Sequence, residues 1–404
     1  MIEAAVYGYG NIGSGVVEVI EKNQDVVARS IGEGVHVKYV LDLREFEGDP
    51  IQSRVVHDVD VIVNDPEIKI ICETMGGNEP AYTFTKKALE KGKSVCTSNK
   101  ELVANHGAEL IRIAAEHNCN YFFEASVGGG IPIIRTLNNA LKQEHILNIS
   151  GIVNGTTNYI LTKMAREGAA FEDVLKQAQE KGYAERNPEA DVEGYDACRK
   201  IAILSSLMSG KTVDFKKIYT EGITKLSAED FLYANQLGKS IKLLAMSKKM
   251  EKGYMAMVAP FMISESHPLY SVNDVFNGIF VKGDMLDDSM YYGRGAGKLP
   301  TASAVVADVI ESARFMGQHL PIDWSQEEEQ LVDIAESARS FFVRLNKKQC
   351  PQSEVEKVFG KGEVVQVAKL AEEYGFLTAV MTEKEFDAKV SSCKGVIGRI
   401  RVEA

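Results

Sequence analysis

The sequence predicts an α/β protein with a parallel sheet at its N-terminus, a central α+β unit and a small α+β unit at its C-terminus. Two observations lead to this fold class. Through about residue 130, apolar runs of strand length alternate with helical patterns, as in parallel sheets with crossover helices. The chain also has 404 residues with 45% hydrophobic content, which is enough for two or three domains with sizeable cores.

The first strand is expected at Ile2 to Tyr7 and runs directly into a glycine motif. The motif is Gly8-Tyr9-Gly10-Asn11-Ile12-Gly13, followed by a helix with Val16, Val17, Val19 and Ile20 on its apolar side. In such a turn the first glycine permits the sharp bend, the second admits a pyrophosphate and the third lets helix and strand pack closely. The motif predicts a Rossmann-type dinucleotide site, and its alternative is a glycine-rich turn in another doubly wound sheet.

The second strand, Val35 to Leu41, ends at Asp42. An acid at this position binds the ribose hydroxyls of NAD, whereas a cation holds the 2′-phosphate of NADP. Because Arg44 lies two residues further on, the sequence leaves both cofactors open. Either side chain could also be ordinary surface polarity.

Further strands are expected at Val61 to Val63, Ile68 to Cys72 and Ser94 to Thr97, with a helix from about Pro80 to Lys91. Thr74 and Met75 follow one of these strands, and Lys100 follows another. Ligands bind at the carboxyl ends of the strands in such sheets. Lys100 is therefore a candidate site residue, and its alternative is a surface lysine at a helix start.

Two loops present backbone groups. Ala125 to Pro132 contains three consecutive glycines before an expected helix from Ile133 to Leu141, which suits phosphate binding, a cation held by carbonyl groups or an interdomain hinge. The segment Asn154-Gly155-Thr156-Thr157 ends a strand, Ile146 to Val153, and precedes a helix from Asn158 to Glu167. It offers donors at a helix start, although a plain N-cap explains part of the pattern.

The segment from Gly182 to Lys200 gathers acids and one lysine where an apolar helix begins. If that helix starts near Gly194, Asp196 and Lys200 share one face, with Glu185 and Asp191 on the preceding loop. Charges at the entrance to a core are usually paired or functional. The pattern indicates a polar pocket for a small charged substrate, and the alternative is a solvated acidic loop.

Composition excludes several classes of function. Acids outnumber Lys plus Arg by 57 to 46, for a net charge of -11, which disfavours nucleic acids and anionic membranes as partners. The six cysteines have no Cys-x-x-Cys spacing, so we expect reduced thiols and a cytoplasmic location. No window approaches eighteen apolar residues, and the N-terminus lacks a basic n-region.

Several blocks together resemble homoserine dehydrogenase. They are Asn154 to Leu161, Gly182 to Lys200, Gly238 to Ala245, His267-Pro268-Leu269 and Gly293 to Ala302, and the resemblance covers residues 1 to 320. It implies an enzyme that interconverts L-homoserine and L-aspartate 4-semialdehyde with NAD or NADP, in threonine and methionine biosynthesis, as a homodimer or homotetramer. Two alternatives are a dehydrogenase of another small amino-acid-like alcohol and a non-catalytic nucleotide-binding regulator.

The resemblance also implies roles for individual residues. Lys100 and Lys200 match the family's active-site lysines, and we favour Lys200 as the residue that moves the proton. The implied substrate site comprises Glu185, Asp191, Asp196, Gly155, Thr156 and Tyr183. The implied cofactor site comprises Gly8, Gly10, Asn11, Ile12, Gly13, Asp42, Arg44, Thr74, Met75, Lys100 and Gly297. A monovalent cation, usually Na⁺, would bind backbone carbonyls at Glu124, Val127, Gly129 and Ile131.

Three domains are expected. Residues 1–130, completed by a helix within 297–320, form the dinucleotide domain, residues 131–296 the substrate and dimerisation domain, and residues 325–404 a small unit. That unit resembles the ACT domain that many homoserine dehydrogenases carry for threonine feedback. Its strands are expected at Ser340 to Leu345 and Val396 to Val402, with a helical piece at Glu354 to Phe359. The family's Asp-x-Pro-Gly turn is replaced by residues 346–351, so we expect a structural role and weak ligand binding there.

Overall fold

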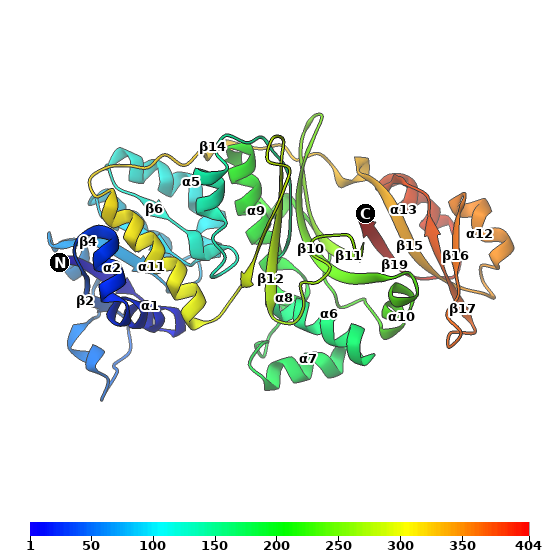
Figure 1. Cartoon of the computed structure of the whole chain (residues 1–404), viewed down its shortest axis with the longest axis horizontal. Coiled ribbons are helices and arrows are strands. Elements are labelled where there is room, and N and C mark those ends of the chain that lie inside the picture. The colour runs from blue at the N-terminus through cyan, green and yellow to red at the C-terminus, as the bar shows by residue number, and fades with distance from the viewer. Residues whose placement is uncertain (404) are drawn as a thin grey trace. The chain divides into compact units, whose positions relative to one another are not determined.

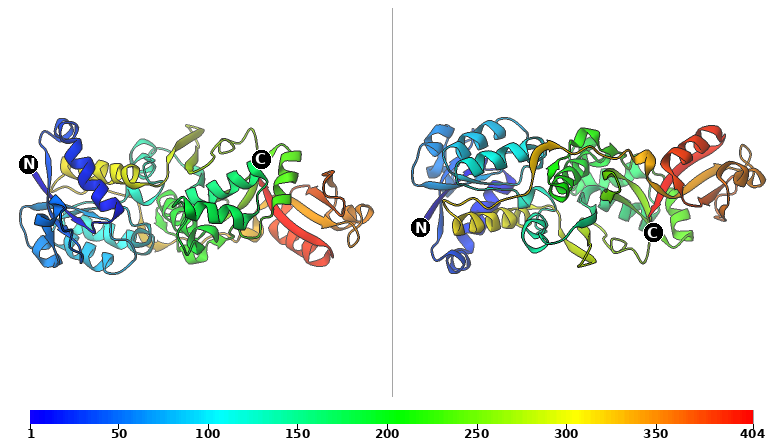
Figure 2. Two further views of the ribbon diagram at one scale, coloured as in Figure 1. Left: turned by 90° about the horizontal axis from the view of Figure 1, so that it is seen from below. Right: turned by 90° about the horizontal axis from the view of Figure 1, so that it is seen from above.

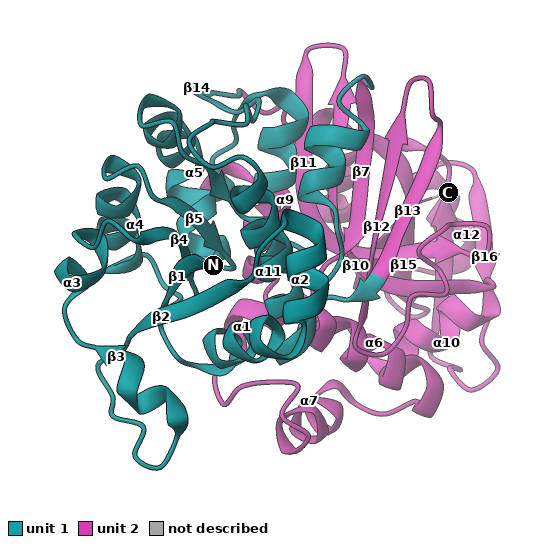
Figure 3. Ribbon diagram, turned by 60° about the vertical axis from the view of Figure 1, so that its left-hand side comes forward, with its two compact units in different colours: residues 1–144, 202–215, 293–329 teal, residues 145–201, 216–292, 330–404 magenta. Residues whose placement is uncertain are grey.

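The structure, a computed structural model, describes residues 1–403 and divides into two compact units. Unit 1 comprises residues 1–144, 202–215 and 293–329, and unit 2 comprises residues 145–201, 216–292 and 330–404. Both units are discontinuous in the chain, as the two colours of Figure 3 show.

Unit 1 contains a six-stranded parallel sheet in the order β3-β2-β1-β4-β5-β6. This is the strand order of Rossmann-type dinucleotide-binding domains, and it confirms the predicted fold class. The order reverses between β1 and β4, the point at which such sheets bind their ligand. The strands are β1 (Ile2–Tyr7), β2 (Val35–Leu41), β3 (Val55–Val56), β4 (Ile68–Glu73), β5 (Ser94–Thr97) and β6 (Tyr121–Phe122).

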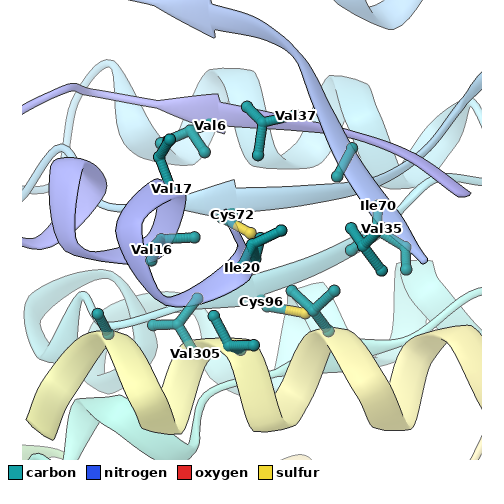
Figure 4. Packing of buried hydrophobic residues seen from close by; sticks show 14 of the residues in the cluster. Val6, Val16, Val17, Ile20, Val35, Val37, Ile70, Cys72, Cys96 and Val305 are labelled. Carbon is teal, nitrogen blue, oxygen red and sulfur yellow. The ribbon is translucent and has the colours of Figure 1, made fainter. Parts of the chain in front are cut away.

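Helices cover both faces of this sheet. α1 and α11 lie on one face, where Val16, Val17 and Ile20 meet Val305 over the strands (Figure 4). α4 and α5 lie on the opposite side (Figure 2). The helices of unit 1 are α1 (Asn11–Lys22), α2 (Gln24–Ile31), α3 (Val59–Val63), α4 (Ala81–Glu90), α5 (Lys100–Glu116) and α11 (Lys298–Arg314), and a small second sheet pairs β8 (Lys211–Thr212) with β14 (Ser325–Glu328).

One strand was predicted in the wrong place. Val61 to Val63 belongs to α3, and the edge strand β3 lies a few residues earlier, at Val55–Val56. The side chain of Asp58 accepts a hydrogen bond from the backbone N–H of Asp60 and so caps a short helix. A capped turn thus overrides the strand preference of a short β-branched run.

Unit 2 is built on a large mixed sheet in the order β13-β12-β7-β10-β11-β19-β15-β17-β16. Long antiparallel strands β10 and β11 form its centre. The strands before the C-terminal segment are β7 (Ile146–Ile152), β9 (Tyr219–Thr220), β10 (Lys239–Met250), β11 (Gly253–Ser264), β12 (Phe276–Gly283) and β13 (Asp288–Arg294), the last of which ends in unit 1. The helices are α6 (Gly155–Glu167), α7 (Phe171–Glu180), α8 (Glu189–Val192), α9 (Tyr195–Ser209), which ends in unit 1, and α10 (Ala228–Gln236).

The C-terminal segment folds as β15-α12-β16-β17-α13-β19 and adds four strands to the sheet of unit 2 (Figure 1). Its order, β19-β15-β17-β16 with antiparallel neighbours, is a ferredoxin-like arrangement. The elements are β15 (Ala338–Asn346), α12 (Gln352–Phe359), β16 (Gly362–Val365), β17 (Glu373–Thr378), β18 (Met381–Thr382), α13 (Glu383–Ser392) and β19 (Val396–Glu403). The two predicted strands and the predicted helical piece all lie within it.

Among residues 1–403, no helix has an apolar stretch long enough to cross a bilayer. The six cysteines are free thiols, and five of them are buried.

Candidate functional site

The glycine motif of unit 1 has the geometry that a pyrophosphate site requires. Gly8 has a φ of 85° after β1, where the chain turns sharply. No atom lies within 4 Å of the place where a Cβ on Gly10 would stand, so that face of the backbone is open. At Gly13 a Cβ would lie 1.9 Å from the carbonyl oxygen of Gly8, so only glycine fits. Gly10 is the N-cap of α1 and provides no side-chain cap, which leaves the N–H groups around Asn11 and Ile12 available to an anion.

Two pockets adjoin this motif. One, of about 460 Å³, is lined by residues of the ends of β1, β2 and β4, including Gly8, Asp42, Thr74 and Met75. The other, of about 580 Å³, is lined mainly by α1 and includes Gly10, Asn11, Arg44 and Lys298. Gly10 and Arg44 line both. The two pockets together give an elongated ligand room to lie across the N-terminus of α1.

Asp42 and Arg44, the two candidates for the ribose end, bind each other. Both carboxylate oxygens of Asp42 accept hydrogen bonds from the Arg44 guanidinium, at 2.9 and 2.8 Å, and the N–H of Tyr9 donates at 2.8 Å. The Arg44 guanidinium lowers the pKa of the Asp42 carboxyl to about 2. The side chain of Asp42 is 8% exposed and that of Arg44 is 61% exposed. The guanidinium therefore neutralises an acid that would otherwise repel a 2′-phosphate.

The loop after β4 is fastened to the glycine motif. The hydroxyl of Thr74 donates to the carbonyl oxygens of Tyr7 and Gly8, at 3.0 and 2.8 Å. The Cα of Met75 lies 3.1 Å from the place of a Gly8 Cβ. Lys100 is half-buried and is the first residue of α5, directly after the N-cap Asn99. Loop and lysine both lie at the carboxyl edge of the parallel sheet, as the strand order requires.

Gly297 also belongs to unit 1. It is the N-cap of α11, with a φ of 117° and no side-chain cap. The ammonium of Lys298, the next residue, lies 2.9 Å from the carboxylate of Glu18 on α1. The start of α11 is thus fixed beside the first turns of α1.

The candidate cation loop is tightly built. Gly128 and Gly129 both have positive φ, and a Cβ on Gly129 would lie 2.6 Å from the backbone of Gly295. The carbonyl oxygen of Ile131 accepts the N–H of Ile133 at 3.0 Å, and Val127 is buried. Backbone carbonyl groups are among the oxygen ligands that cations use in proteins. Within residues 1–403, no group of three His, Cys, Asp or Glu side chains has metal-binding geometry.

The side chain of Glu124 also binds the backbone of the segment that follows the loop. Its carboxylate accepts the N–H groups of Ile134 and Arg135, at 2.9 and 2.7 Å, and its own N–H donates to Asp308 on α11. Burial raises the pKa of the Glu124 carboxyl and raises that of Asp308 to about 8. The expected helix at Ile133 to Leu141 is a short helical segment with a π-helical turn at Thr136–Ala140.

In unit 2, the side chain of Asn154 binds two of the predicted acids, and one of these acids binds the predicted lysine. The amide nitrogen of Asn154 donates to Asp191 at 2.7 Å and to Asp196 at 2.9 Å, while its oxygen accepts the N–H of Thr157 at 2.8 Å. The ammonium of Lys200 donates to Asp196 and to the carbonyl oxygen of Val153, both at 2.7 Å. The side chains of Asp196 and Lys200 are 6% and 11% exposed. Asn154, Asp196 and Lys200 are buried and Asp191 is half-buried, so hydrogen bonds fix the direction of each of these polar side chains.

Two bounds near the cluster differ from expectation. α6 begins at Gly155 rather than at Asn158, because the side chain of Asn154 caps it. Asp191 lies in a short helix, α8, rather than on a loop, because acidic residues follow Pro188 at a helix start. Asp196 and Lys200 share one face of α9, as predicted.

Glu185 and Tyr183 are not drawn into the cluster. The Glu185 side chain is exposed and forms no ion pair within residues 1–403, whereas its carbonyl oxygen accepts from Gln179 at 3.1 Å. Tyr183 is 45% exposed, packs edge to face on Tyr159, and accepts the Thr156 hydroxyl through its carbonyl oxygen at 2.6 Å. Thr156 therefore fixes the loop rather than joining Asp191.

Two buried polar residues, Asn154 and Glu73, were not predicted as site residues. The segment Asn154 to Thr157 was interpreted as a source of hydroxyl and N–H donors or as a plain N-cap, but the side-chain amide of Asn154 was not proposed to bind the acids. Glu73 lies just beyond the predicted strand, Ile68 to Cys72, and was assigned no role, yet it ends β4 and is fully buried. A charged residue ending an apolar strand was the signal that could have identified it.

A Rossmann-type unit with an open glycine turn, together with a second unit that holds a buried Asp–Lys cluster, defines a nicotinamide-dependent oxidoreductase. Comparisons with known proteins identify the family. Residues 8–124 match the homoserine dehydrogenase NAD binding domain, and residues 132–310 match homoserine dehydrogenase itself.

Individual homoserine dehydrogenases are similar to this chain over most of its length. Homoserine dehydrogenase of Neisseria gonorrhoeae is 39% identical over 360 residues, 87% of this chain and 83% of the relative. The crystal structure of a homoserine dehydrogenase from Thiobacillus denitrificans superimposes with a TM-score of 0.92 at 34% identity, covering 100% of this chain and 98% of that one. A hyperthermophilic archaeal homoserine dehydrogenase in complex with NADPH gives a TM-score of 0.65 at 28% identity, covering 77% and 97%. The chain belongs to the homoserine dehydrogenase family.

Proposed function

We propose that the chain interconverts L-homoserine and L-aspartate 4-semialdehyde with NAD or NADP. The observation that carries the proposal is the cluster of Asn154, Asp191, Asp196 and Lys200, in a chain that also has an open glycine turn. Homoserine carries an ammonium group, which the acids attract. It also carries the alcohol, which the reaction oxidises.

The residues of the chain supply proton transfer and orientation. The bound nicotinamide would accept the hydride, and the hydroxyl proton must leave the substrate in the same reaction. We assign that proton to Lys200, whose neutral amine would accept it when homoserine is oxidised and whose ammonium would return it when the semialdehyde is reduced. Asp196 and the carbonyl oxygen of Val153 hold the amino group in place. A general acid or base held in this way contributes about 100- to 10,000-fold. Lys100 is the second candidate, at the N-terminus of α5.

Absorbance at the NAD(P)H band tests this function. The purified protein should reduce NAD or NADP with L-homoserine, and oxidise NAD(P)H with aspartate semialdehyde. Reduction with another amino alcohol but not with homoserine indicates the first alternative, a different dehydrogenase. Cofactor binding without turnover of any such substrate indicates the second, a regulator.

The coenzyme preference is proposed to depend on the pair of Asp42 and Arg44. Asp42 alone would select NAD by repelling a 2′-phosphate, but Arg44 is bound to both of its oxygens and is itself exposed. We therefore propose that the enzyme accepts both coenzymes.

The C-terminal segment is proposed to be structural. β19 pairs with β11 of the main sheet at Phe261, Met262 and Ile263. From β19, the buried side chain of Arg401 donates to Glu383 and to Glu221, both at 2.6 Å. These contacts make the segment an integral part of unit 2.

The loop of this segment that replaces the family's ligand turn satisfies its own donors. The side-chain oxygen of Asn346 accepts the N–H groups of Lys348 and Gln349, and its carbonyl oxygen accepts that of Cys350. The phenol of Tyr374 donates to the carbonyl oxygen of Cys350 at 2.9 Å. Few groups remain for an amino-acid ligand, so we propose that threonine binds weakly if at all.

We further propose three properties of the whole protein. A monovalent cation, Na⁺, binds the carbonyl groups of residues 124–131. The protein forms a homodimer or homotetramer, supported by the edge strand β13, which exposes Met290 and Tyr292. It resides in a reducing compartment such as the cytoplasm, supported by the free thiols.

A further inference from the structure

Glu73 is a buried ionisable residue of unit 1 that no step of the proposed reaction uses. It is the last residue of β4, and it is 0% exposed in the middle of the parallel sheet, with Tyr7 of β1 on one side and Thr97 of β5 on the other. Burial raises the pKa of the Glu73 carboxyl, and the Thr97 hydroxyl and the N–H of Met75 oppose that rise. A buried carboxylate held only by neutral donors is costly unless each oxygen is satisfied.

Each oxygen of Glu73 is satisfied by a different segment. Oε1 accepts the N–H of Met75 at 2.8 Å, in the loop that follows β4. Oε2 accepts the hydroxyl of Thr97 at 2.6 Å, at the end of β5. The Thr97 oxygen itself accepts the N–H of Asn99 at 2.9 Å, so its proton points to Glu73.

The chain of hydrogen bonds continues to the N-terminus of α5, where Lys100 lies. The side-chain oxygen of Asn99 accepts the N–H of Leu102 at 3.1 Å and caps α5, whose first residue is Lys100. The Asn99 amide nitrogen donates to the carbonyl oxygen of Gly77 at 2.7 Å. The Glu73 carboxylate thus holds the loop 74–77 through Met75 and holds the N-cap of α5 through Thr97 and Asn99. Asn99 in turn holds the other end of the loop, at Gly77.

The loop also borders the candidate cofactor site. Met75 lies against Gly8, and the hydroxyl of Thr74 bonds to the carbonyl oxygen of Gly8. Gly76 and Gly77 both have positive φ and carry no side chains, so this half of the loop is held through its backbone. Glu73 holds the N–H of Met75, and Asn99 holds the carbonyl oxygen of Gly77.

We propose that Glu73 is a positioning residue that sets the Thr74–Gly77 loop and Lys100 relative to the bound nicotinamide coenzyme. It acts through Met75 and through the Thr97–Asn99 relay, without touching substrate. The inference rests on the proposed function, because it concerns the placement of Lys100. A carboxylate is required because both of its partners are donors, whereas a glutamine offers one acceptor oxygen and turns an N–H₂ group toward the other donor.

The test uses the full-length protein and begins with E73Q, which keeps the size of the side chain. The dissociation constant of NADPH, and of NADH, is measured by fluorescence without homoserine, alongside kcat and the homoserine KM. We expect the coenzyme dissociation constant to rise about tenfold, because a hydrogen bond to a charged group is lost. We expect kcat to fall about 10- to 100-fold with a homoserine KM within about twofold, because the displaced group acts on the reacting centre.

Matched variants of Thr97 test the relay. T97V removes the hydroxyl at nearly constant volume and should change both constants in the same direction as E73Q. T97S keeps a hydroxyl and should recover most of what T97V loses. The double variant E73Q/T97V should be no worse than E73Q alone, because both substitutions break one chain of contacts. If E73Q fails to fold, the comparison of T97V with T97S decides the proposal.

A third variant separates this proposal from the function of Lys100. K100A should lower kcat, and the double variant E73Q/K100A should bind the coenzyme more weakly than K100A, because the contact of Glu73 with Met75 does not depend on the lysine side chain. If K100A retains full turnover, the role of Lys100 is wrong, while the effect of E73Q on coenzyme binding still tests the loop. Folded E73Q with an unchanged coenzyme dissociation constant and kcat overturns the proposal. So does a fall of kcat that only follows the fraction of folded protein.

Discussion

Replacing Lys200 by methionine tests the assignment of the proton-transferring residue. The ammonium of Lys200 lies 2.7 Å from Oδ2 of Asp196, and both side chains are nearly buried, at 11% and 6% exposure. Methionine keeps most of the volume and removes the charge. We expect turnover to fall about 100- to 10,000-fold, which corresponds to about 2.7–5.4 kcal/mol of transition-state stabilisation.

The same substitution affects stability, because it leaves the Asp196 carboxylate buried. At 2.7 Å and an effective dielectric constant of about 20, the attraction within the pair is about 6 kcal/mol, largely offset by desolvation. Removing one partner of a buried pair costs about 3–5 kcal/mol. We expect the lower end of this range, because the Asn154 amide still donates to Asp196 at 2.9 Å.

A double variant separates the two effects. K200M/D196N removes both charges, so it should recover most of the stability that K200M loses, and it should remain inactive. Urea unfolding gives the stability of each protein, and initial rates with saturating homoserine and coenzyme give kcat. Turnover within tenfold of the unmodified enzyme in folded K200M refutes the assignment, and Lys100 then becomes the candidate.

Three further predictions concern binding. D191A should raise the homoserine KM more than E185A, because Asp191 is held by Asn154, whereas Glu185 is exposed and forms no ion pair within residues 1–403. Steady-state kinetics that rank the two variants in the opposite order contradict this. D42A should shift the ratio of kcat/KM for the two coenzymes toward NADP, because it removes a negative charge from the ribose end, and R44A should shift it toward NAD, because it removes a positive charge. If neither variant changes this ratio, the pair does not select the coenzyme. Threonine at millimolar concentration should change neither the rate nor Tm, since the loop before α12 uses its own donors, and strong inhibition would show that the segment is a working sensor.

The sequence determined the elements whose patterns are local. The glycine turn needs Gly8 at positive φ and no Cβ at Gly13, and both requirements are visible as glycines. The helical spacing of Asp196 and Lys200 likewise placed them on one face of α9. Strand period, apolar run length and helix spacing are properties of neighbouring residues, so they can be recognised without knowledge of the fold.

The tertiary structure decided the contacts between distant segments. Asn154 reaches Asp191 and Asp196 across about forty residues of chain, and Glu73 reaches Thr97 on the neighbouring strand. The strand at Val61 to Val63 was misplaced because a cap from Asp58 outweighed a weak β preference. Which donor meets which acceptor depends on strand order and register, and no local pattern encodes these, because they result from the packing of the whole sheet.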